Sequence, residues 1–312
     1  MGEKIATRDA YGEALAQLGR SNPDIVVLDA DLSGSTKTAV FAREFPQRFF
    51  NMGIAEANMM GTAAGLAAAG KIPFASTFAV FATGRAFDQV RNSICYPQLN
   101  VKIAATHAGL TVGEDGASHQ SVEDIALMRA LPNMTVLVPA DGVEARLAVR
   151  AAAEHVGPVY LRLGRPKVPV IFGDDYSFEI GRAVRLREGS DVTLAACGYM
   201  VGPALAAAKL LAGEGIEARV LNMSTLKPLD GDALLAAARE TGALVTAEEH
   251  SIIGGLGSAV AEFLGQEYPV PVLRVGIGDT FGESGPPEEL LEKYGLTAGD
   301  ILAAAKKAMG MK

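Results

Sequence analysis

The stretch IPFASTFAVFATGRAFDQVRNSICYPQLNVKIAATH, residues 72–107, sets the pattern of the chain. It opens with the apolar run 72–77 and closes with another at 101–107, and residues 80–93 between them have the composition of a helix. Short apolar runs rich in β-branched residues are typical of strands that are buried on both faces. Two such strands separated by a helix predict a parallel sheet covered by helices.

The same alternation extends in both directions. Further strands are expected at 25–29, 135–138 and 158–163, and helices at 7–19, 55–69, 121–130 and 142–153. A second series predicts strands at 191–197, 216–222, 243–249 and 270–276, with helices at 201–213, 231–240, 256–264, 286–294 and 298–309. Residues 165–190 are rich in proline, glycine and charge, so we expect a linker with one hairpin there. The predicted fold is α/β, with two doubly wound domains of mostly parallel sheet over residues 1–180 and 187–312.

The bulk composition excludes several kinds of protein. Of the 312 residues 49% are hydrophobic, which favours a packed core over disorder. The net charge of −8 argues against a nucleic-acid partner, because that role needs a basic surface. The N-terminus, MGEKIATRDAYGE, is too polar for a signal peptide, and the apolar run 57–70 is too short for a membrane span. Cys95 and Cys197 lack metal-ligand spacing, so we expect reduced thiols in a cytoplasmic protein.

Ligands of doubly wound sheets bind in the loops that follow the strands, and the richest such loop is THAGLTVGEDGASHQSVED, 106–124. It contains His107, Asp115 and His119, and its glycines allow sharp turns and a close approach of a ligand. A single histidine there would more often be structural, whereas two histidines with an acid favour a binding site. Ser121 and Asp124 loosely match a capping box for the next helix, so part of the composition serves local structure.

Arginine and aromatic side chains give two further candidate groups. Four side chains could bind phosphate, whose oxygens suit the guanidinium fork, although lone arginines are usually solvated: Arg8, Ser35, Arg162 and Arg165. Phe78 and Phe81 lie three residues apart after a predicted strand. They fit either the core of a helix or a platform for a flat heterocycle.

The segment NMGIAEANMMGTAAGLAAAG, 51–70, contains one charged residue, Glu56. An acid in the first turn of a helix is stabilised by the helix dipole by about 0.3–1 kcal/mol, which would account for an exposed glutamate. The small residues that follow suit close helix contact, however, so the helix and its carboxylate could both be buried. A buried carboxylate needs a partner, and a ring nitrogen of a ligand is one.

Together these motifs resemble the transketolase family of thiamine diphosphate enzymes over nearly all of the chain. The match is to the C-terminal half of a full transketolase, which comprises the pyrimidine-binding and C-terminal domains. GIAEANMMGTAAGLA (53–67) resembles the segment whose glutamate hydrogen-bonds N1′ of the thiamine aminopyrimidine. THAGLTVGEDGASHQSVEDIALMRALPNM (106–134) is the most specific match. EEHSIIGGLGSAVAEFL (248–264) and GIGDTFGESGPPEELLEKYGL (276–296) resemble the family's C-terminal domain.

The resemblance implies a role for each candidate residue. Glu56 would activate the cofactor, and His107 and His119 would contact oxygens near the reacting carbonyl. Asp115 would read a hydroxyl group of the donor sugar. The substrate phosphate would be held by Arg8, Ser35 and Arg165, and the cofactor would also touch Phe78, Phe81 and Asp31. Transketolases often carry a tyrosine three residues beyond the second aromatic, where this chain has Gly84.

One family motif is missing. The diphosphate half of a transketolase contains Gly-Asp-Gly and a later asparagine, which hold the metal and the diphosphate, and no Gly-Asp-Gly occurs in these 312 residues. The resemblance therefore implies a split enzyme. Its N-terminal subunit would bind the diphosphate and a divalent metal, Mg or Ca, and this chain would form the dimer core of a heterotetramer. Together they would transfer a two-carbon ketol unit between sugar phosphates.

Three alternatives share parts of this pattern. A deoxyxylulose-phosphate-synthase-like subunit and the β chain of a 2-oxo acid dehydrogenase E1 component have the same pair of domains. The His107, Asp115 and His119 set and the phosphate-binding positions favour transketolase over both. The third alternative is a non-catalytic assembly subunit, against which the retention of Glu56 argues.

Overall fold

A sheet of seven strands forms the centre of the N-terminal unit in the computed structural model, which describes residues 3–173 and 175–312. In spatial order the strands are β12 (Thr225–Lys227), β6 (Thr135–Leu137), β7 (Val159–Arg162), β5 (Lys102–Thr106), β4 (Ile72–Phe78), β2 (Ile25–Asp29) and β3 (Phe49–Asn51). Neighbours run parallel except β12, which pairs antiparallel with β6. All the strands predicted for this half of the chain are present.

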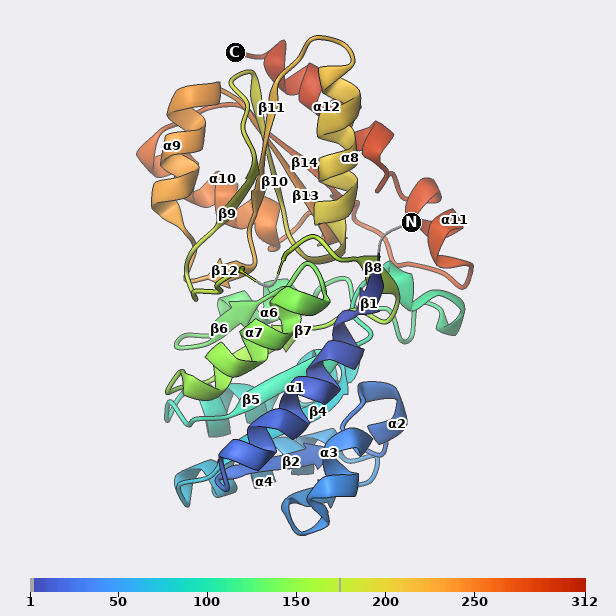
Figure 1. Cartoon of the computed structure of the whole chain (residues 1–312), viewed down its shortest axis with the longest axis vertical. Helices are drawn as coiled ribbons and strands as arrows, with labels where there is room; N and C mark the ends of the chain where they lie inside the picture. Colours follow the sequence, from blue (N-terminus) through green and yellow to red (C-terminus); the bar gives the residue numbers. More distant parts are fainter. Residues whose placement is uncertain (1–2, 174) are drawn as a thin grey trace.

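Helices cover both faces of this sheet (Figure 1). One face carries α1 (Thr7–Ser21) and α7 (Gly142–Glu154), and the other carries α4 (Glu56–Ala68) and α6 (Asp124–Ala130). Side chains of a strand alternate between the two faces. Thus Val27 packs with α1 and α7, while its neighbour Leu28 packs with α4.

Residues 80–93, predicted as a regular helix, form a distorted helical segment instead. Two π-helical turns, 81–85 and 90–95, flank the short α5 (Phe87–Gln89). Such turns widen a helix and are frequent at functional sites. Here the first of them follows β4 directly, which brings Phe81 and Arg85 to the end of that strand.

The predicted capping box at Ser121 is wrong. The helix begins at Asp124, and its N-terminus receives no side-chain cap from Glu123. The Asp124 carboxylate instead accepts hydrogen bonds from Tyr160 Oη at 2.6 Å and Arg162 Nε at 2.8 Å. A buried ion pair with the neighbouring strand has replaced the local contact that the sequence pattern suggested.

The C-terminal unit has its own sheet. The strand order is β14 (Val272–Ile277), β13 (Leu244–Ser251), β10 (Val192–Ala196), β11 (Ala218–Asn222) and β9 (Val184–Arg187), with only β9 antiparallel among these strands. One face packs against α8 (Val201–Ala212) and α12 (Ala298–Met309), and the other against α9 (Gly231–Thr241) and α10 (Leu256–Glu267). The helix α11 (Pro287–Lys293) contacts the loop around residues 110–115.

The expected hairpin within residues 165–190 is wrong. The two short strands of this segment pair with distant partners: β8 (Lys167–Pro169) with β1 (Lys4–Ala6), and β9 with β11. The sequence pattern also missed the short helices α2 (Ser33–Thr36) and α3 (Ala39–Glu44). Elements of three to six residues carry too little periodicity to be recognised.

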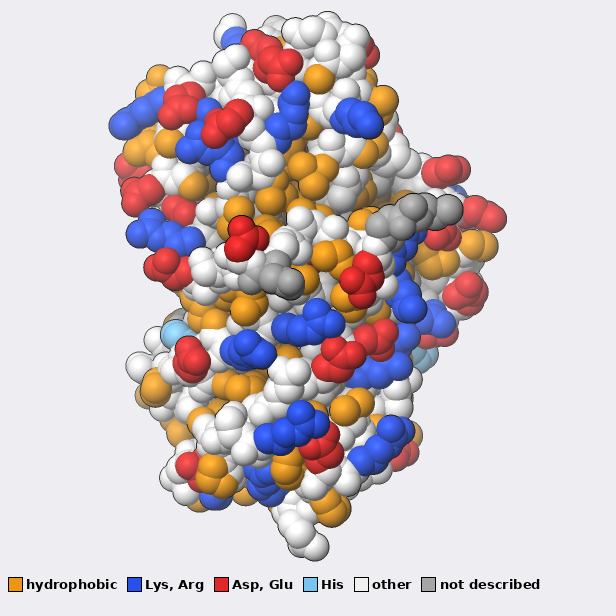
Figure 2. Space-filling model, in the orientation of Figure 1, with side chains coloured by type: hydrophobic (Ala, Val, Ile, Leu, Met, Phe, Trp, Pro, Cys, Tyr) orange, Lys and Arg blue, Asp and Glu red, His pale blue; other side chains and the backbone are white. Residues whose placement is uncertain are grey.

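The two units share a core. Residues of α4 and α6 belong to the same buried apolar cluster as residues of α9 and α10, and β12 crosses from the second half of the chain into the first sheet. Acidic and basic side chains are interspersed over both units on the face drawn in Figure 2. Within the described part of the chain, no helix has the length and apolar character needed to cross a membrane.

Candidate functional site

The predicted site residues gather at one edge of the N-terminal sheet. Asp31 follows β2, Phe78 ends β4, and His107 follows β5. These three strands are parallel neighbours, so their carboxyl ends meet at the same edge. The positions therefore come together because of the sheet order, although they are far apart in the sequence.

A pocket of about 370 Å³ surrounds Glu56. Its lining is Ala30, Asp31, Leu32, Ile54, Glu56, Phe81, Arg85, Ser118 and His119. Glu56 is the first residue of α4 and is only 2% exposed, so of the two alternatives that the sequence left open, an exposed or a buried carboxylate, the structure has the buried one. The size falls in the range of small-molecule pockets.

The sequence interpretation missed Arg85, the partner that Glu56 has in this structure. Arg85 Nη1 donates to Glu56 Oε1 at 3.0 Å, and the Arg85 guanidinium lies 4.4 Å from the centroid of the Phe81 ring. Arg85 follows Phe81 by four residues, a spacing that places two side chains on one face of a helix. That spacing indicates the contact of Arg85 with Phe81, whereas nothing in the local pattern indicates its pairing with Glu56.

Four rings form a continuous cluster beside this pocket. Phe78 stacks on Phe81 with centroids 5.9 Å apart and on His107 at 3.8 Å. His119 meets Phe81 edge-on at 5.4 Å. The aromatic pair therefore lies with both predicted histidines, and Phe81 faces the Glu56 pocket.

A cationic cluster lies at the other end of these rings. Arg8 Nη1 donates to His107 Nε2 at 3.2 Å and to the Ser35 carbonyl oxygen at 3.1 Å. Arg165 donates to the Val112 carbonyl oxygen and lies 3.8 Å from Asp115 Oδ2. The positive charge of Arg165 lowers the pKa of both Arg8 and His107, after the larger effect of burial.

Arg162, which the sequence also offered as a phosphate ligand, is not available for that role. Its guanidinium is buried against Asp124, with Nε at 2.8 Å from Oδ2 and Nη2 at 3.2 Å from Oδ1. The same ion pair raises the Arg162 pKa above its ordinary value, against the effect of burial. Arg162 is therefore a structural cation.

His107 is held neutral by its surroundings. Its pKa is lowered to about 3, first by burial and then by the charges of Arg8 and Arg165. Because arginine can only donate, His107 Nε2 is the acceptor, and Nδ1 therefore carries the proton and donates to Thr106 Oγ1 at 2.8 Å. The backbone of His107 is left-handed, with φ of 57°, which turns its ring back toward Phe78.

Asp31 lies on the rim of the Glu56 pocket. Its Oδ1 accepts from Asn51 Nδ2 at 2.9 Å, and its φ is 65°.

Gly84 leaves open space, since a Cβ there would meet no atom within 4 Å. Among residues 3–173 and 175–312, no group of three or more His, Cys, Asp or Glu side chains is arranged to hold a metal ion.

Two family models match the chain. The transketolase pyrimidine binding domain matches residues 3–170, and the transketolase C-terminal domain matches residues 181–301. The two matches together cover most of the sequence.

Some of the similar proteins have nearly the same extent as this chain, whereas the chain spans about half the length of others. A Methanocaldococcus jannaschii protein whose name includes "transketolase C-terminal section" is 51% identical, over 97% of this chain and 95% of the relative. A protein named 6-deoxy-6-sulfo-D-fructose transketolase subunit, from Clostridium sp., is 48% identical over 98% of this chain and 95% of its own length. A solved structure described as a split gene transketolase, inactive beta4 tetramer, is 65% identical, with a TM-score of 0.93 and 99% of both chains covered.

Proposed function

The chain belongs to the transketolase family, and on that premise we propose that it is the C-terminal subunit of a two-chain, thiamine-diphosphate-dependent transketolase. The reaction is transfer of a two-carbon ketol unit from a ketose phosphate to an aldose phosphate. The observation that carries the proposal is the row of rings from Phe81 through Phe78 to His107. It joins a pocket with a buried carboxylate to a cluster of cations, so one site offers places for a heterocycle and for a phosphate.

The pocket around Glu56 fits the aminopyrimidine ring of the cofactor. Its walls include Leu32, Ile54 and Phe81, which suit a flat ring, and its one fully buried charge is Glu56. The Arg85 side chain is 53% exposed, so it can swing away and leave the carboxylate to hydrogen-bond a ring nitrogen. Thiamine diphosphate, when bound, supplies the electron sink for the two-carbon unit. Glu56 would hydrogen-bond the ring and set its protonation, and Phe81 and Asp31 in the pocket lining, with Phe78 stacked on Phe81, would orient it.

The loop residues act on the sugar. His107 and His119 flank the phenylalanine rings, and we assign to them the oxygens near the reacting carbonyl. The neutral His107 offers hydrogen bonds without a competing charge. Asp115, further along the same loop, reads a hydroxyl group of the donor. Positioning of this kind accounts for a large share of the rate of group-transfer enzymes.

The cationic cluster holds the substrate phosphate. Arg8 and Arg165 come from opposite ends of the N-terminal unit's sequence, and Ser35 lies beside Arg8. Burial lowers the Arg8 pKa most, and the charge of Arg165 lowers it further, so a phosphate between the two guanidinium groups would relieve part of that strain.

A separate N-terminal subunit completes the enzyme. The sequence lacks Gly-Asp-Gly, so we assign the diphosphate and the divalent metal, Mg or Ca, mainly to that partner. We also propose that this chain forms a dimer core through its exposed apolar side. Ile54 is 77% exposed, and Gly61 and Gly65 of α4 face open space. Exposed apolar patches of this kind mark interfaces.

The domain division that we propose places the pyrimidine-binding domain in residues 1–180 and the transketolase C-terminal domain in residues 187–312. We propose a cytoplasmic location, on the basis of the sequence composition and the two reduced cysteines. Sugar phosphates are the proposed substrates, without nucleic acid or membrane partners.

Reconstitution with the N-terminal subunit tests this function. The chain is titrated with its partner, thiamine diphosphate and Mg²⁺ while ketol transfer and mass by light scattering are followed. We expect no turnover from the chain alone, which should be a dimer or larger. Turnover should rise to a plateau at an equimolar ratio, most simply as a two-plus-two heterotetramer. Full activity without the partner would disprove the split-enzyme assignment, and turnover of a 2-oxo acid in place of a ketose phosphate would favour the dehydrogenase alternative.

A further inference from the structure

The loop that carries Asp115 and His119 is hydrogen-bonded to the C-terminal unit. The backbone N–H of Thr111 donates to Glu249 Oε1 at 2.5 Å. Gln120 Nε2 donates to the Glu283 carbonyl oxygen at 2.9 Å, and Ser284 Oγ donates to the Glu114 carbonyl oxygen. These contacts tie the loop to the C-terminal unit.

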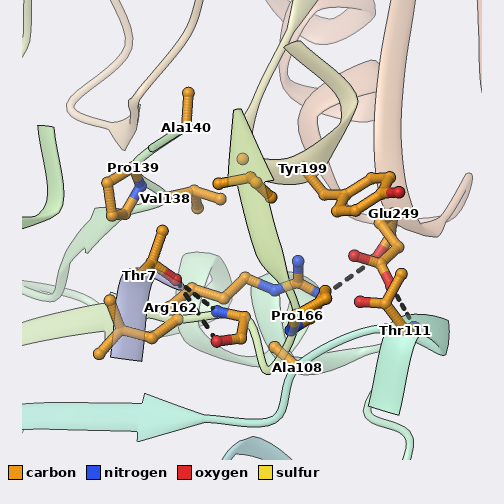
Figure 3. A pocket seen from close by; sticks show the side chains of 14 residues that line it. Thr7, Ala108, Thr111, Val138, Pro139, Ala140, Arg162, Pro166, Tyr199 and Glu249 are labelled. Atoms are coloured by element: carbon orange, nitrogen blue, oxygen red, sulfur yellow. Dashed lines mark hydrogen bonds between the residues drawn. The ribbon is translucent and has the colours of Figure 1, made fainter. Parts of the chain in front are cut away.

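Of these contacts, only the one at Glu249 uses a buried carboxylate. Glu249 lies in β13 and is 3% exposed, and Figure 3 shows its side chain pointing from that strand toward Thr111. A cavity of about 20 Å³ lies beside Glu249, where the two units meet, and is lined also by Thr7, Arg162 and Tyr199. That volume is enough for no more than about one water molecule, and the contact that the carboxylate makes there is with the loop.

The main chain of Glu249 is fixed as well. Arg162 Nη2 donates to its carbonyl oxygen at 2.9 Å, and Arg162 is itself held by Asp124. Asp124 begins α6, the helix that follows the loop. The start of the loop is therefore bound to β13 through the Glu249 side chain, and its end is bound to β13 through Asp124 and Arg162. The backbone N–H of Ser251 adds a bond to the Val122 carbonyl oxygen at 2.7 Å.

The loop is shaped to receive this carboxylate. Gly109 has φ of +83°, and a Cβ there would lie 2.3 Å from Cδ of Glu249. Any other residue at this position would both strain the backbone and displace the carboxylate. Gly109 lies between His107 and Thr111, so the contact is made at the root of the loop.

We propose that Glu249 is a positioning residue for the proposed ketol transfer, which fixes the root of the loop 109–120 and thereby the placement of Asp115 and His119 relative to His107. This inference rests on the proposed function for its catalytic consequence, but the anchoring itself does not. The anchoring gives the C-terminal unit a role in the site. Loss of the hydrogen bond from Thr111 to Glu249 should loosen the loop without disturbing the N-terminal sheet.

Glu248 provides a matched control. It is the neighbouring residue of β13 and is also buried, but its two oxygens accept from the backbone N–H groups of Leu256 and Gly257 at 2.6 and 2.8 Å. Those bonds hold α10 within the C-terminal unit and do not reach the loop. Glu248→Ala should therefore cost stability without freeing residues 109–120.

Hydrogen–deuterium exchange of the purified chain tests the anchoring. In Glu249→Ala we expect exchange over residues 109–120 to be faster by about tenfold or more, because a buried hydrogen bond is lost. In Glu248→Ala the increase should fall on residues 254–265. Glu249→Gln keeps an acceptor oxygen and should stay within about threefold of wild type. Gly109→Ala, which displaces the carboxylate from the loop side, should reproduce the Glu249→Ala effect if Glu249→Ala itself folds poorly.

Two results would overturn the anchoring: unchanged loop exchange in both Glu249→Ala and Gly109→Ala, and equal loop exchange in the two alanine variants of Glu248 and Glu249. Loop exchange in Glu249→Gln as fast as in Glu249→Ala would overturn the hydrogen bond as the basis of the anchoring, because the charge of Glu249 would then hold the loop.

Kinetics with the partner subunit test the consequence. Glu249→Ala should raise KM for the ketose phosphate and lower kcat, each by about tenfold, while Glu248→Ala leaves both near wild type. A loosened loop with unchanged kinetics would overturn the positioning role. Absence of ketol transfer in the wild-type pair would instead count against the proposed function, and the exchange result would still decide the anchoring.

Discussion

Arg8 donates a hydrogen bond from Nη1 to Nε2 of His107 across 3.2 Å, and this contact selects the tautomer of a histidine that burial already keeps neutral. An arginine cannot accept, so Nε2 carries no proton, and the ring is neutral with its proton on Nδ1. The same arginine lies beside Ser35 in the proposed phosphate site. A phosphate bound at that proposed site would therefore affect the hydrogen bonding of the histidine that stacks on Phe78.

The neutral state of His107 makes its stability contribution depend on pH. The folded-state pKa is about 3 and the ordinary value is 6.5, so below pH 6.5 the unfolded chain binds a proton that the folded chain does not. The contribution of His107 to the free energy of unfolding is complete above pH 6.5 and is lost as the pH falls toward 3. Between pH 8 and pH 5 this amounts to about 2 kcal/mol. His107→Gln should therefore destabilise the chain by about 2 kcal/mol less at pH 5 than at pH 8, in urea unfolding at both values. A pH-independent difference would contradict the neutral, buried assignment.

Glu56 is predicted to be essential for turnover. Glu56→Gln preserves the shape of the side chain and should leave folding intact, but it removes the carboxylate that faces the pocket. With the partner and cofactor saturating, we expect turnover to fall by roughly 10²–10⁴-fold, the usual effect of a positioned acid or base. Glu44→Gln, a surface acid paired with Arg20, is the control and should have no effect. Turnover of Glu56→Gln within threefold of wild type would refute the role.

Arg165 is predicted to recognise phosphate specifically. Arg165→Ala should raise KM for phosphorylated sugars by about ten- to a hundredfold, the scale of a lost charge-assisted hydrogen bond. A non-phosphorylated two-carbon donor should be nearly unaffected, because it makes no contact with this end of the site. Arg146→Ala, on the surface of α7, is the matched control. If both donors suffer equally, Arg165 has a structural role through its contact with Val112.

Gly84 and Gly12 should respond oppositely to the same substitution. Gly84 has open space beyond its Cα and lies in a helical turn, so Gly84→Ala should stabilise the chain by about 0.5–1 kcal/mol through a lower entropy of the unfolded state. A Cβ at Gly12 would lie 2.7 Å from the Lys37 carbonyl oxygen, so Gly12→Ala should destabilise it. Thermal unfolding of the two variants gives the comparison, and a destabilised Gly84→Ala would mean that a neighbour occupies the space beside it.

Sequence periodicity was sufficient for the buried strands and the longer helices, because β2, β4 and β5 are mostly apolar and are buried almost throughout. It failed where structure depends on a distant partner. β1 and β8 are three residues each and exist only through their pairing with one another. Likewise, the sequence gives Arg162 and Arg165 as equal candidates for phosphate binding, and only the fold shows that Arg162 forms a buried ion pair with Asp124.

In the site too, local motifs were predictable and contacts with distant partners were not. The family segments placed Glu56, Phe78, Phe81 and the loop histidines together, and the structure brings them to one strand edge. The contacts of Arg85 and Glu249 could not be read from local pattern. Arg85 pairs with a carboxylate 29 residues away on α4, and Glu249 reaches the loop from another sheet.

The crossing of β12 limits how this chain can be divided or recombined. Thr225–Lys227 belongs to the second half of the sequence but covers β6, which would otherwise be an open edge of the first sheet. A fragment that stops at residue 180 would therefore expose unpaired backbone groups and should aggregate. Chimaeras between relatives that exchange only the N-terminal half inherit a mismatched edge strand, so recombination should exchange residues 225–227 along with the sheet that they complete.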